Sequence, residues 1–168
     1  MIRLEFKYDA VASALEEAGK RLEDMTPLYQ GILDYMVDQT KQRFIDGVGP
    51  DGRAWAPKSP VTLALYAARG DGNRPKPLIG PSGRLSSEIN GQANASNAEL
   101  GSSLEYSAVM QDGAAQGAFG RTSRGGPIPY GNIPARVWLG LSDVDEEEMV
   151  GIADDYLLEL FEGRGFNG

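Results

Sequence analysis

The fold is decided by the stretch from residue 133 to residue 161, which reads IPARVWLGLSDVDEEEMVGIADDYLLELF. In its second half, apolar residues recur at the spacing of one helix face: Met149, Ile152, Ala153, Tyr156, Leu157, Leu160 and Phe161. Ser142 and the acidic run Glu146–Glu148 mark the start of this amphipathic helix, because a hydroxyl caps free N–H groups and carboxylates suit the positive end of the helix dipole. The first half, Ile133–Leu139, predicts a strand that Pro134 confines to its start or to a sheet edge.

Toward the amino terminus, the sequence predicts one strand and two helices. Residues 2–8 alternate apolar and charged side chains, as a half-buried strand does. Asp9 caps a predicted helix over Ala10–Asp24. Thr26 caps a second one, with Pro27 at its first position, that runs to about Asp46 and ends at Gly47. Its inward residues are Leu28, Ile32, Leu33, Met36 and Phe44. The two helices form a helical hairpin or a bent pair.

The middle of the chain is rich in Gly and Pro and predicts long loops. A short helix is predicted over Val61–Ala68. Leu85–Ile89 and Leu100–Leu104 flank an Asn-rich segment and predict a β-hairpin with a loop of about six to ten residues. Residues 106–111 either turn helically or continue the sheet. The glycine-rich segment 112–132 predicts a flexible loop.

The order of these elements indicates an α+β fold. A small antiparallel sheet is packed by an N-terminal helical pair and a C-terminal amphipathic helix, and the connections are long Gly/Pro-rich loops. The 168 residues fit a single domain, 1–168.

Composition excludes several classes of enzyme. The chain contains no Cys and no His, which removes disulfides, thiol nucleophiles, Ser-His pairs and the usual zinc ligands. No nucleotide-binding or hydrolase motif occurs. The acidic run 143–148 does not fit a calcium loop, since Glu148 and Asp154 stand where such a loop needs Gly and Glu. We therefore predict no catalytic residue, no cofactor and no metal site.

Charge is unevenly distributed along the chain. Residues 1–48 carry 6 basic and 9 acidic side chains (−3), residues 49–136 carry 9 and 6 (+3), and residues 137–168 carry 1 and 9 (−8), which sum to the net charge of −8. This balance disfavours nucleic-acid binding, which relies on Lys and Arg. No apolar run is long enough for a membrane span, and the first residues lack the layout of a signal peptide, so we expect a soluble protein.

Several individual residues allow two interpretations. Trp55, in a Pro/Gly loop, either fills the core or anchors a partner, whereas Trp138 is expected in the core. Arg121 and Arg124 either clamp a phosphate or only solubilise a mobile loop. Arg136 is expected to pair with the acidic helix or with a neighbouring subunit.

Four motifs occur in a fixed order along the chain. They are PDGRAWAPKS (residues 50–59) after Phe44, SGRLSS (82–87) after Leu78-Ile79, YSAVMQDG (106–113) after Leu100-Gly101-Ser102, and IPARVWLGLS (133–142). Together they resemble the virion morphogenesis, or tail completion, family of Mu-like phages and prophages, over about residues 40–145. Ser82 stands where that family usually has Thr, and Met110 where it often has His. Since a catalytic His would not tolerate Met, this departure favours a structural role for the motif.

The motif residues also have physical roles of their own. Asp51-Gly52 predicts a tight turn that aims Trp55 inward. Gly83 and Gly113 stand where a turn or a helix end needs a positive φ.

The resemblance implies a structural virion protein that completes or terminates the phage tail and assists head–tail joining as a homo-oligomeric ring. The implied partners are other virion proteins (tail tube, head–tail connector), with no membrane and no sequence-specific nucleic acid. The protein is expected in the virion, assembled in the host bacterial cytoplasm. The residues expected to make structural or partner contacts are Asp51, Gly52, Trp55, Gly83, Leu85, Tyr106, Gly113, Arg121, Arg124, Pro134, Arg136 and Trp138.

Three alternatives stay open at this point. The first is a minor head–tail connector or tail-tube-associated component, which differs in its place in the virion. The second is a small carboxylate-dependent hydrolase, for which Asp51, Glu88 and Glu105 are the candidates. The third, a nucleic-acid-binding packaging accessory, is disfavoured by the charge balance.

Overall fold

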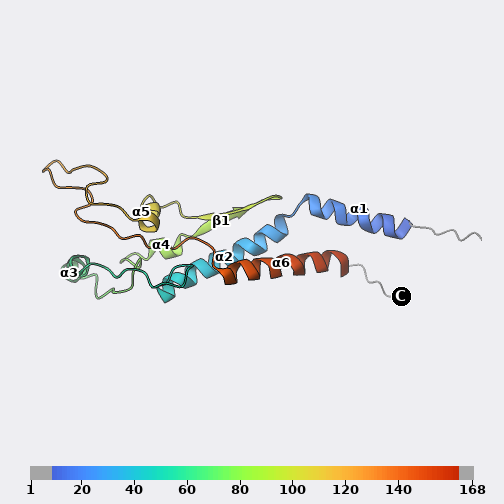
Figure 1. Ribbon diagram of the computed structural model, residues 1–168, viewed down its shortest axis with the longest axis horizontal. Coiled ribbons are helices and arrows are strands. Elements are labelled where there is room, and N and C mark those ends of the chain that lie inside the picture. Colours follow the sequence, from blue (N-terminus) through green and yellow to red (C-terminus); the bar gives the residue numbers. More distant parts are fainter. Residues whose placement is uncertain (1–8, 163–168) are drawn as a thin grey trace, which may run out of the picture.

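The computed structural model of the protein describes residues 9–162 and has an elongated shape (Figure 1). In chain order its elements are α1 (Asp9–Glu23), α2 (Thr26–Asp46), α3 (Pro60–Arg69), α4 (Arg84–Ser87), β1 (Asn90–Ala93), β2 (Ala98–Gly101), α5 (Ser107–Asp112) and α6 (Asp143–Glu162). Helices and a two-stranded antiparallel sheet confirm the predicted α+β fold. The strand predicted over residues 2–8 lies outside the described residues.

The helix α2 is the central element of the fold. The β1–β2 hairpin and α6 both pack on it (Figure 1). Leu28, Leu33, Met36 and Phe44 are buried as predicted, whereas Ile32 is only half-buried. Gly47 ends α2 with φ 76°, and its N–H donates to the Arg43 carbonyl.

The two N-terminal helices form a bent pair and not a hairpin. They follow one another end to end, and α1 packs on α6 (Figure 1). The predicted cap of α2 is wrong by one residue, because Met25 occupies the cap position without a side-chain hydrogen bond. The Thr26 hydroxyl is engaged elsewhere, since it donates to Asp24 Oδ1 at 2.5 Å.

The predicted β-hairpin is present, but its boundaries differ from the prediction. Asn90 pairs with Gly101 and Ala93 with Ala98, so only residues 94–97 connect the strands. Asn94 makes this short connection possible, because its side-chain oxygen accepts from the N–H groups of Ser96 (2.9 Å) and Asn97 (3.1 Å). Leu85 lies in the short helix α4 instead of a strand.

The strand predicted over Ile133–Leu139 is wrong. Only Ile133 forms a β-bridge, with Ala114. Further along, the side-chain oxygen of Gln111 accepts from the N–H groups of Trp138 (2.9 Å) and Leu139 (3.0 Å). A glutamine side chain on α5 thus takes the place that a neighbouring strand would have, and the segment belongs to no sheet.

The main core is built around three aromatic side chains. Phe44 lies 5.2 Å from Trp55 and 6.0 Å from Trp138 between ring centroids. Both indole N–H groups are satisfied, because Trp55 Nε1 donates to the Val137 carbonyl (2.8 Å) and Trp138 Nε1 to the Ser107 carbonyl (3.2 Å). Leu85, Ile89 and Leu104 complete the buried cluster.

The start of α6 is fixed by a capping box and a buried ion pair. The Ser142 hydroxyl accepts from the Asp145 N–H (3.2 Å), and the Asp145 carboxylate accepts from the Ser142 N–H (2.7 Å), which confirms the predicted helix start. Arg43 Nη2, on α2, donates to the same carboxylate at 2.5 Å. Arg43 Nη1 donates to the Gly140 carbonyl at 2.7 Å. One guanidinium therefore joins the end of α2, the segment before α6 and α6 itself.

The glycine-rich segment 112–132 projects from the body of the molecule and doubles back on itself (Figure 1). The N–H of Phe119 donates to the Ile128 carbonyl (2.7 Å), and the N–H of Ile128 donates to the Gly120 carbonyl (2.8 Å). A second bridge joins Arg121 to Pro127. The flexibility of segment 112–132 stays a prediction.

The helix predicted over Val61–Ala68 is confirmed as α3, and residues 107–112 turn helically as α5.

The close approach of the hairpin to α2 generates a first prediction. A Cβ at Gly91 would overlap the Glu99 carbonyl oxygen and a Leu33 methyl group, whereas a Cβ at Gly101 would meet nothing within 4 Å. We expect Gly91→Ala to lower the free energy of unfolding by about 2 kcal/mol or more, because overpacking forces strands and helix apart. Urea unfolding measures this, with Gly101→Ala as the matched control. Equal effects of the two substitutions would contradict the packing described.

The Arg43–Asp145 pair generates a second prediction. Burial raises the pKa of Asp145, but the hydrogen bonds from Ser142 and the charge of Arg43 outweigh it, and the net pKa lies below its ordinary value of 3.8. The stability that this carboxylate contributes is therefore complete above about pH 4 and is lost as the pH falls through the lowered folded-state pKa.

We expect Asp145→Asn to lower the free energy of unfolding at neutral pH by about 3 kcal/mol, because it leaves the Arg43 charge buried without a counter-charge. The variant also loses the part of the acid-induced destabilisation that Asp145 causes. Urea unfolding of both proteins over a pH series below neutrality checks both effects. Curves that stay parallel down to the lowest pH would show that Asp145 is not the titrating group.

Candidate functional site

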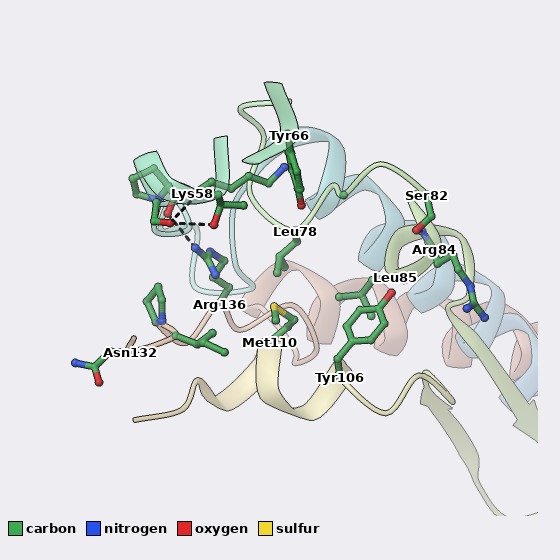
Figure 2. A pocket seen from close by; sticks show the side chains of 16 residues that line it. Lys58, Tyr66, Leu78, Ser82, Arg84, Leu85, Tyr106, Met110, Asn132 and Arg136 are labelled. Carbon is green, nitrogen blue, oxygen red and sulfur yellow. Dashed lines mark hydrogen bonds between the residues drawn. The ribbon is translucent and has the colours of Figure 1, made fainter. Parts of the chain in front are cut away.

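A pocket of about 530 Å³ opens at the end of the molecule where α3, α4 and α5 meet the segment 132–136 (Figure 2). This volume is within the range of ligand-binding pockets, about 300–1,000 Å³. Lys58 and Arg136 lie at one end, Leu78 and Met110 in the middle, and Tyr106 with Arg84 at the other end (Figure 2). The pocket thus combines basic groups with an apolar wall.

Lys58 is positioned by the start of α3. The Ser59 hydroxyl caps this helix by accepting from the Thr62 N–H (3.1 Å), and Pro60 occupies the first turn. The Lys58 ammonium donates to the Arg74 carbonyl (2.7 Å) and to the Ile79 carbonyl, and it lies 5.1 Å from the centre of the Tyr66 ring. Burial, followed by the positive charges of Arg74 and Arg136, lowers the pKa of Lys58.

Arg136 enters the pocket from the segment that follows the glycine-rich loop. Its backbone N–H donates to the Met110 carbonyl (2.9 Å). Its guanidinium donates to two backbone carbonyls of the segment 50–59, Nε to Ala56 (2.7 Å) and Nη2 to Pro57 (2.9 Å). Burial of the guanidinium lowers its pKa. The predicted pairing of Arg136 with the acidic helix is wrong within the described chain, because these two carbonyls hold the side chain.

The positive charge of the pocket is not neutralised by nearby carboxylates. Neither Asp nor Glu is among the described residues that line it. Lys58 and Arg136 are in contact with neutral carbonyls and take part in no ion pair within residues 9–162. Arg84 differs, since Glu88 holds it at 2.6 Å. The arrangement can therefore accept an anionic group that also has an apolar part.

The predicted site residues separate into interior and surface groups. Trp55, Leu85 and Trp138 are buried in the core, which decides between the two interpretations of Trp55 in favour of the core. Tyr106 and Pro134 line the pocket together with Leu85 and Arg136. Their predicted role in partner contact stays a prediction.

The turn-forming residues behave as predicted. Asp51 Oδ1 accepts from the Arg53 N–H (3.1 Å), and Gly52 has φ 72°. This tight turn brings Trp55 into the core. Gly83 and Gly113 have φ 64° and 75°, at the start of α4 and the end of α5. Their function is to set the direction of the chain around the pocket.

Arg121 and Arg124 lie on the projecting loop, apart from the pocket. Arg121 Nη1 donates to the Gly125 carbonyl at 3.0 Å, a local contact within the loop. Arg124 is exposed near the loop tip. The structure does not bring these side chains together with Lys58 or Arg136.

Sequence reasoning missed Lys58 and Tyr66 as site residues, and Arg43 and Asp145 as the buried pair. Lys58 belongs to the motif PDGRAWAPKS, but its partners come from residues 66, 74 and 79, which spacing along the chain does not connect. The sequence does contain a signal that places Asp145 at the start of α6, because it follows Ser142 by three residues, the spacing of a capping box.

Two of the three carboxylates named for the hydrolase alternative form local contacts, and the third is exposed. Asp51 forms the turn before Trp55, Glu88 is bound by two nitrogens of Arg84, and Glu105 is exposed. Within residues 9–162, no cluster of three or more acidic side chains is arranged to hold a metal ion. None of the described helices has the length and apolar character that crossing a bilayer requires.

Comparison with known families gives one match. The sequence model of the phage virion morphogenesis family matches residues 6–158, a range that includes the pocket, the core and most of α6. The family resemblance drawn from the four motifs is thereby confirmed, and the match extends it on both sides. No curated protein and no solved structure matches the chain.

The double contact of Arg136 generates a third prediction. We expect Arg136→Lys to lower the free energy of unfolding by about 2 kcal/mol, because an ammonium cannot satisfy both the Ala56 and Pro57 carbonyls. Arg53→Lys is the control, since the Arg53 side chain is 88% exposed. Chemical unfolding of both variants checks this, and an unchanged Arg136→Lys midpoint would contradict the role of the guanidinium.

Proposed function

The chain belongs to the phage virion morphogenesis family, and we propose that, within virion assembly, it completes or terminates the tail and assists head–tail joining. The observation that carries this proposal is the family match over residues 6–158 of an elongated subunit. Binding to other virion components follows from the family. Its place at the tail end, with the tail tube and the head–tail connector as neighbours, is part of the proposal.

The subunit is suited to repeated contacts in which one surface of a copy meets a different surface of the next copy. Its pocket end carries Lys58 and Arg136, which take part in no ion pair within residues 9–162, while α6, with nine acidic and no basic residues, runs toward the other end (Figure 1). Two unlike surfaces on one subunit make heterologous contacts, which close into a ring when the rotation between copies allows it. A ring of such subunits at the end of the tail is the proposed assembly.

The projecting loop provides a further contact surface in this assembly. Phe119 is 55% exposed and Tyr130 is 72% exposed on segment 112–132. Exposed aromatic residues are frequent anchors of protein interfaces. We propose that this loop is fixed by neighbouring virion proteins, and that a protease site within it becomes protected on assembly.

The proposal also covers location and nucleic acid. Assembly takes place in the host bacterial cytoplasm, and the product is part of the virion. A subunit with a net charge of −8 leaves DNA in a central channel unbound.

Inactivation of the gene in the phage that encodes it tests the function. We expect heads and tails to form separately and to remain unjoined, and electron microscopy of the lysate counts them. Adding the purified protein to the separated tail fraction, before heads are supplied, restores joined infectious particles.

The order of addition distinguishes the alternatives. A minor head–tail connector would restore joining after incubation with heads and not with tails. Normal joined particles in the absence of the gene product would contradict both roles in joining.

A further inference from the structure

The helix α6 carries an unusual excess of negative charge. Its 20 residues include nine acidic and no basic side chains. Of the α6 side chains that the structure describes, only Asp145 takes part in an ion pair with another described residue. Glu146, Glu147 and Glu148 are exposed, and so are Asp154 and Asp155. No basic side chain within residues 9–162 forms an ion pair with these exposed carboxylates, so like charges crowd this helix.

The outward side of α6 also exposes apolar groups. Asp143, Glu147, Val150, Asp154 and Leu158 follow at steps of four, three, four and four residues and share one helix face. We call these five residues the outer stripe. Val150 is 61% exposed and Leu158 is 54% exposed within it. The opposite face, with Met149, Ile152 and Tyr156, is half-buried, as expected for the side that packs on α2 and α1. A helix face that exposes both carboxylates and apolar side chains can bind in a groove that offers positive charge and apolar contact.

The pocket has the complementary chemistry. Lys58 and Arg136 supply positive charge without a neighbouring carboxylate, and Leu78, Met110 and Ile133 supply apolar contact. Both properties match the outer stripe. The Lys58 ammonium is already fixed by two carbonyls, so little side-chain entropy is lost when an anion binds.

The two surfaces are arranged so that one copy cannot satisfy both by itself. The inner face of α6 is fixed against α2 by packing and by the Arg43–Asp145 pair, and its outer stripe faces away from that contact. The residues that line the pocket belong to α3, α4, α5 and adjoining segments, and α6 runs away from these helices (Figure 1). A second copy can bring its outer stripe to the pocket.

We propose that the outer stripe of α6 of one copy binds in the Lys58–Arg136 pocket of the next copy. This inference rests on the proposed function and deepens it, because it names the two surfaces through which neighbouring copies meet in the ring. Acidic side chains of the stripe face the ammonium and the guanidinium, and Val150 and Leu158 meet the apolar wall. The contact is heterologous, so each copy uses one stripe and one pocket.

Two variants that each damage one surface test the contact. Lys58→Met removes one of the two positive charges of the pocket that are in no ion pair within the described chain, and Glu147→Lys with Asp154→Lys reverses two exposed charges of the stripe. We expect each variant alone to raise the dissociation constant of self-association about tenfold or more, as loss of complementary charge does. A mixture of the two restores a single contact, and light scattering then gives a mass of twice 18.0 kDa that does not grow further.

A matched control separates this effect from a change in net charge. Asp38→Lys with Asp46→Lys changes the charge by the same amount at exposed positions of α2, outside the stripe. We expect it to associate as the unsubstituted chain does. Equal weakening by control and stripe variant, or a mixture that stays monomeric, would overturn the proposal.

A zero-length carbodiimide cross-link on the unsubstituted protein gives a second test that does not depend on variants. This reagent joins an amine to a carboxylate only where the two are in contact. In a mixture of isotope-labelled and unlabelled chains, we expect mass spectrometry to find Lys58 joined to a carboxylate of the outer stripe of another copy. Absence of this product up to the solubility limit would overturn the contact.

The remaining outcomes are distinguishable from failure of the proposed function. Capture of DNA by the pocket, lost in Lys58→Met, would replace the second copy with nucleic acid and overturn the inference. If Lys58→Met joins heads to tails as efficiently as the unsubstituted chain, the contact is wrong while tail completion stands. If the unsubstituted chain itself does not restore joining, the proposed function fails.

Discussion

The buried ion pair between Arg43 and Asp145 is the interaction on which the rest of the structure depends. Arg43 stands in the last turn of α2, Asp145 in the first turn of α6, and the same guanidinium also holds the Gly140 carbonyl. Because a buried charge without its partner is strongly unfavourable, these three segments have one stable arrangement. The pair fixes the direction of α6, and it also holds the segment that carries Arg136 into the pocket. The pair thus connects the acidic helix to the segment that carries Arg136, whose guanidinium the Ala56 and Pro57 carbonyls then hold.

Local signals explain what the sequence predicts well. Apolar periodicity, the Ser142 cap and the Gly47 end place α2 and α6 almost to the residue, because these signals act within one turn of helix. The hairpin boundaries and the segment 133–139 were mispredicted for a different reason. There, hydrogen bonds from side chains to the backbone decide the structure: Asn94 shortens the hairpin connection, and Gln111 takes the place of a paired strand beside Trp138. The sequence does not predict the pocket either, because Lys58, Tyr66 and Arg136 are brought together only by tertiary contacts.

The proposed assembly follows from charges that a single copy leaves uncompensated. Salt bridges inside the described chain are mostly local pairs on one helix, such as Lys20 with Glu16 and Arg84 with Glu88. Among the described residues, the carboxylates of the outer stripe and the pocket side chains Lys58 and Arg136 take part in no ion pair. A virion assembly protein meets many copies of itself or of its neighbours at high local concentration, where weak complementary contacts become effective together. This provides a physical reason for an acidic helix and a basic pocket on one small subunit.

Electron cryomicroscopy of the joined head–tail particle tests this central claim most directly. The proposed contact between copies predicts a ring in which α6 of each copy lies over Lys58 and Arg136 of the next copy, with Val150 and Leu158 covered. A ring in which these pockets face solvent, while α6 packs on a different virion protein, would contradict it.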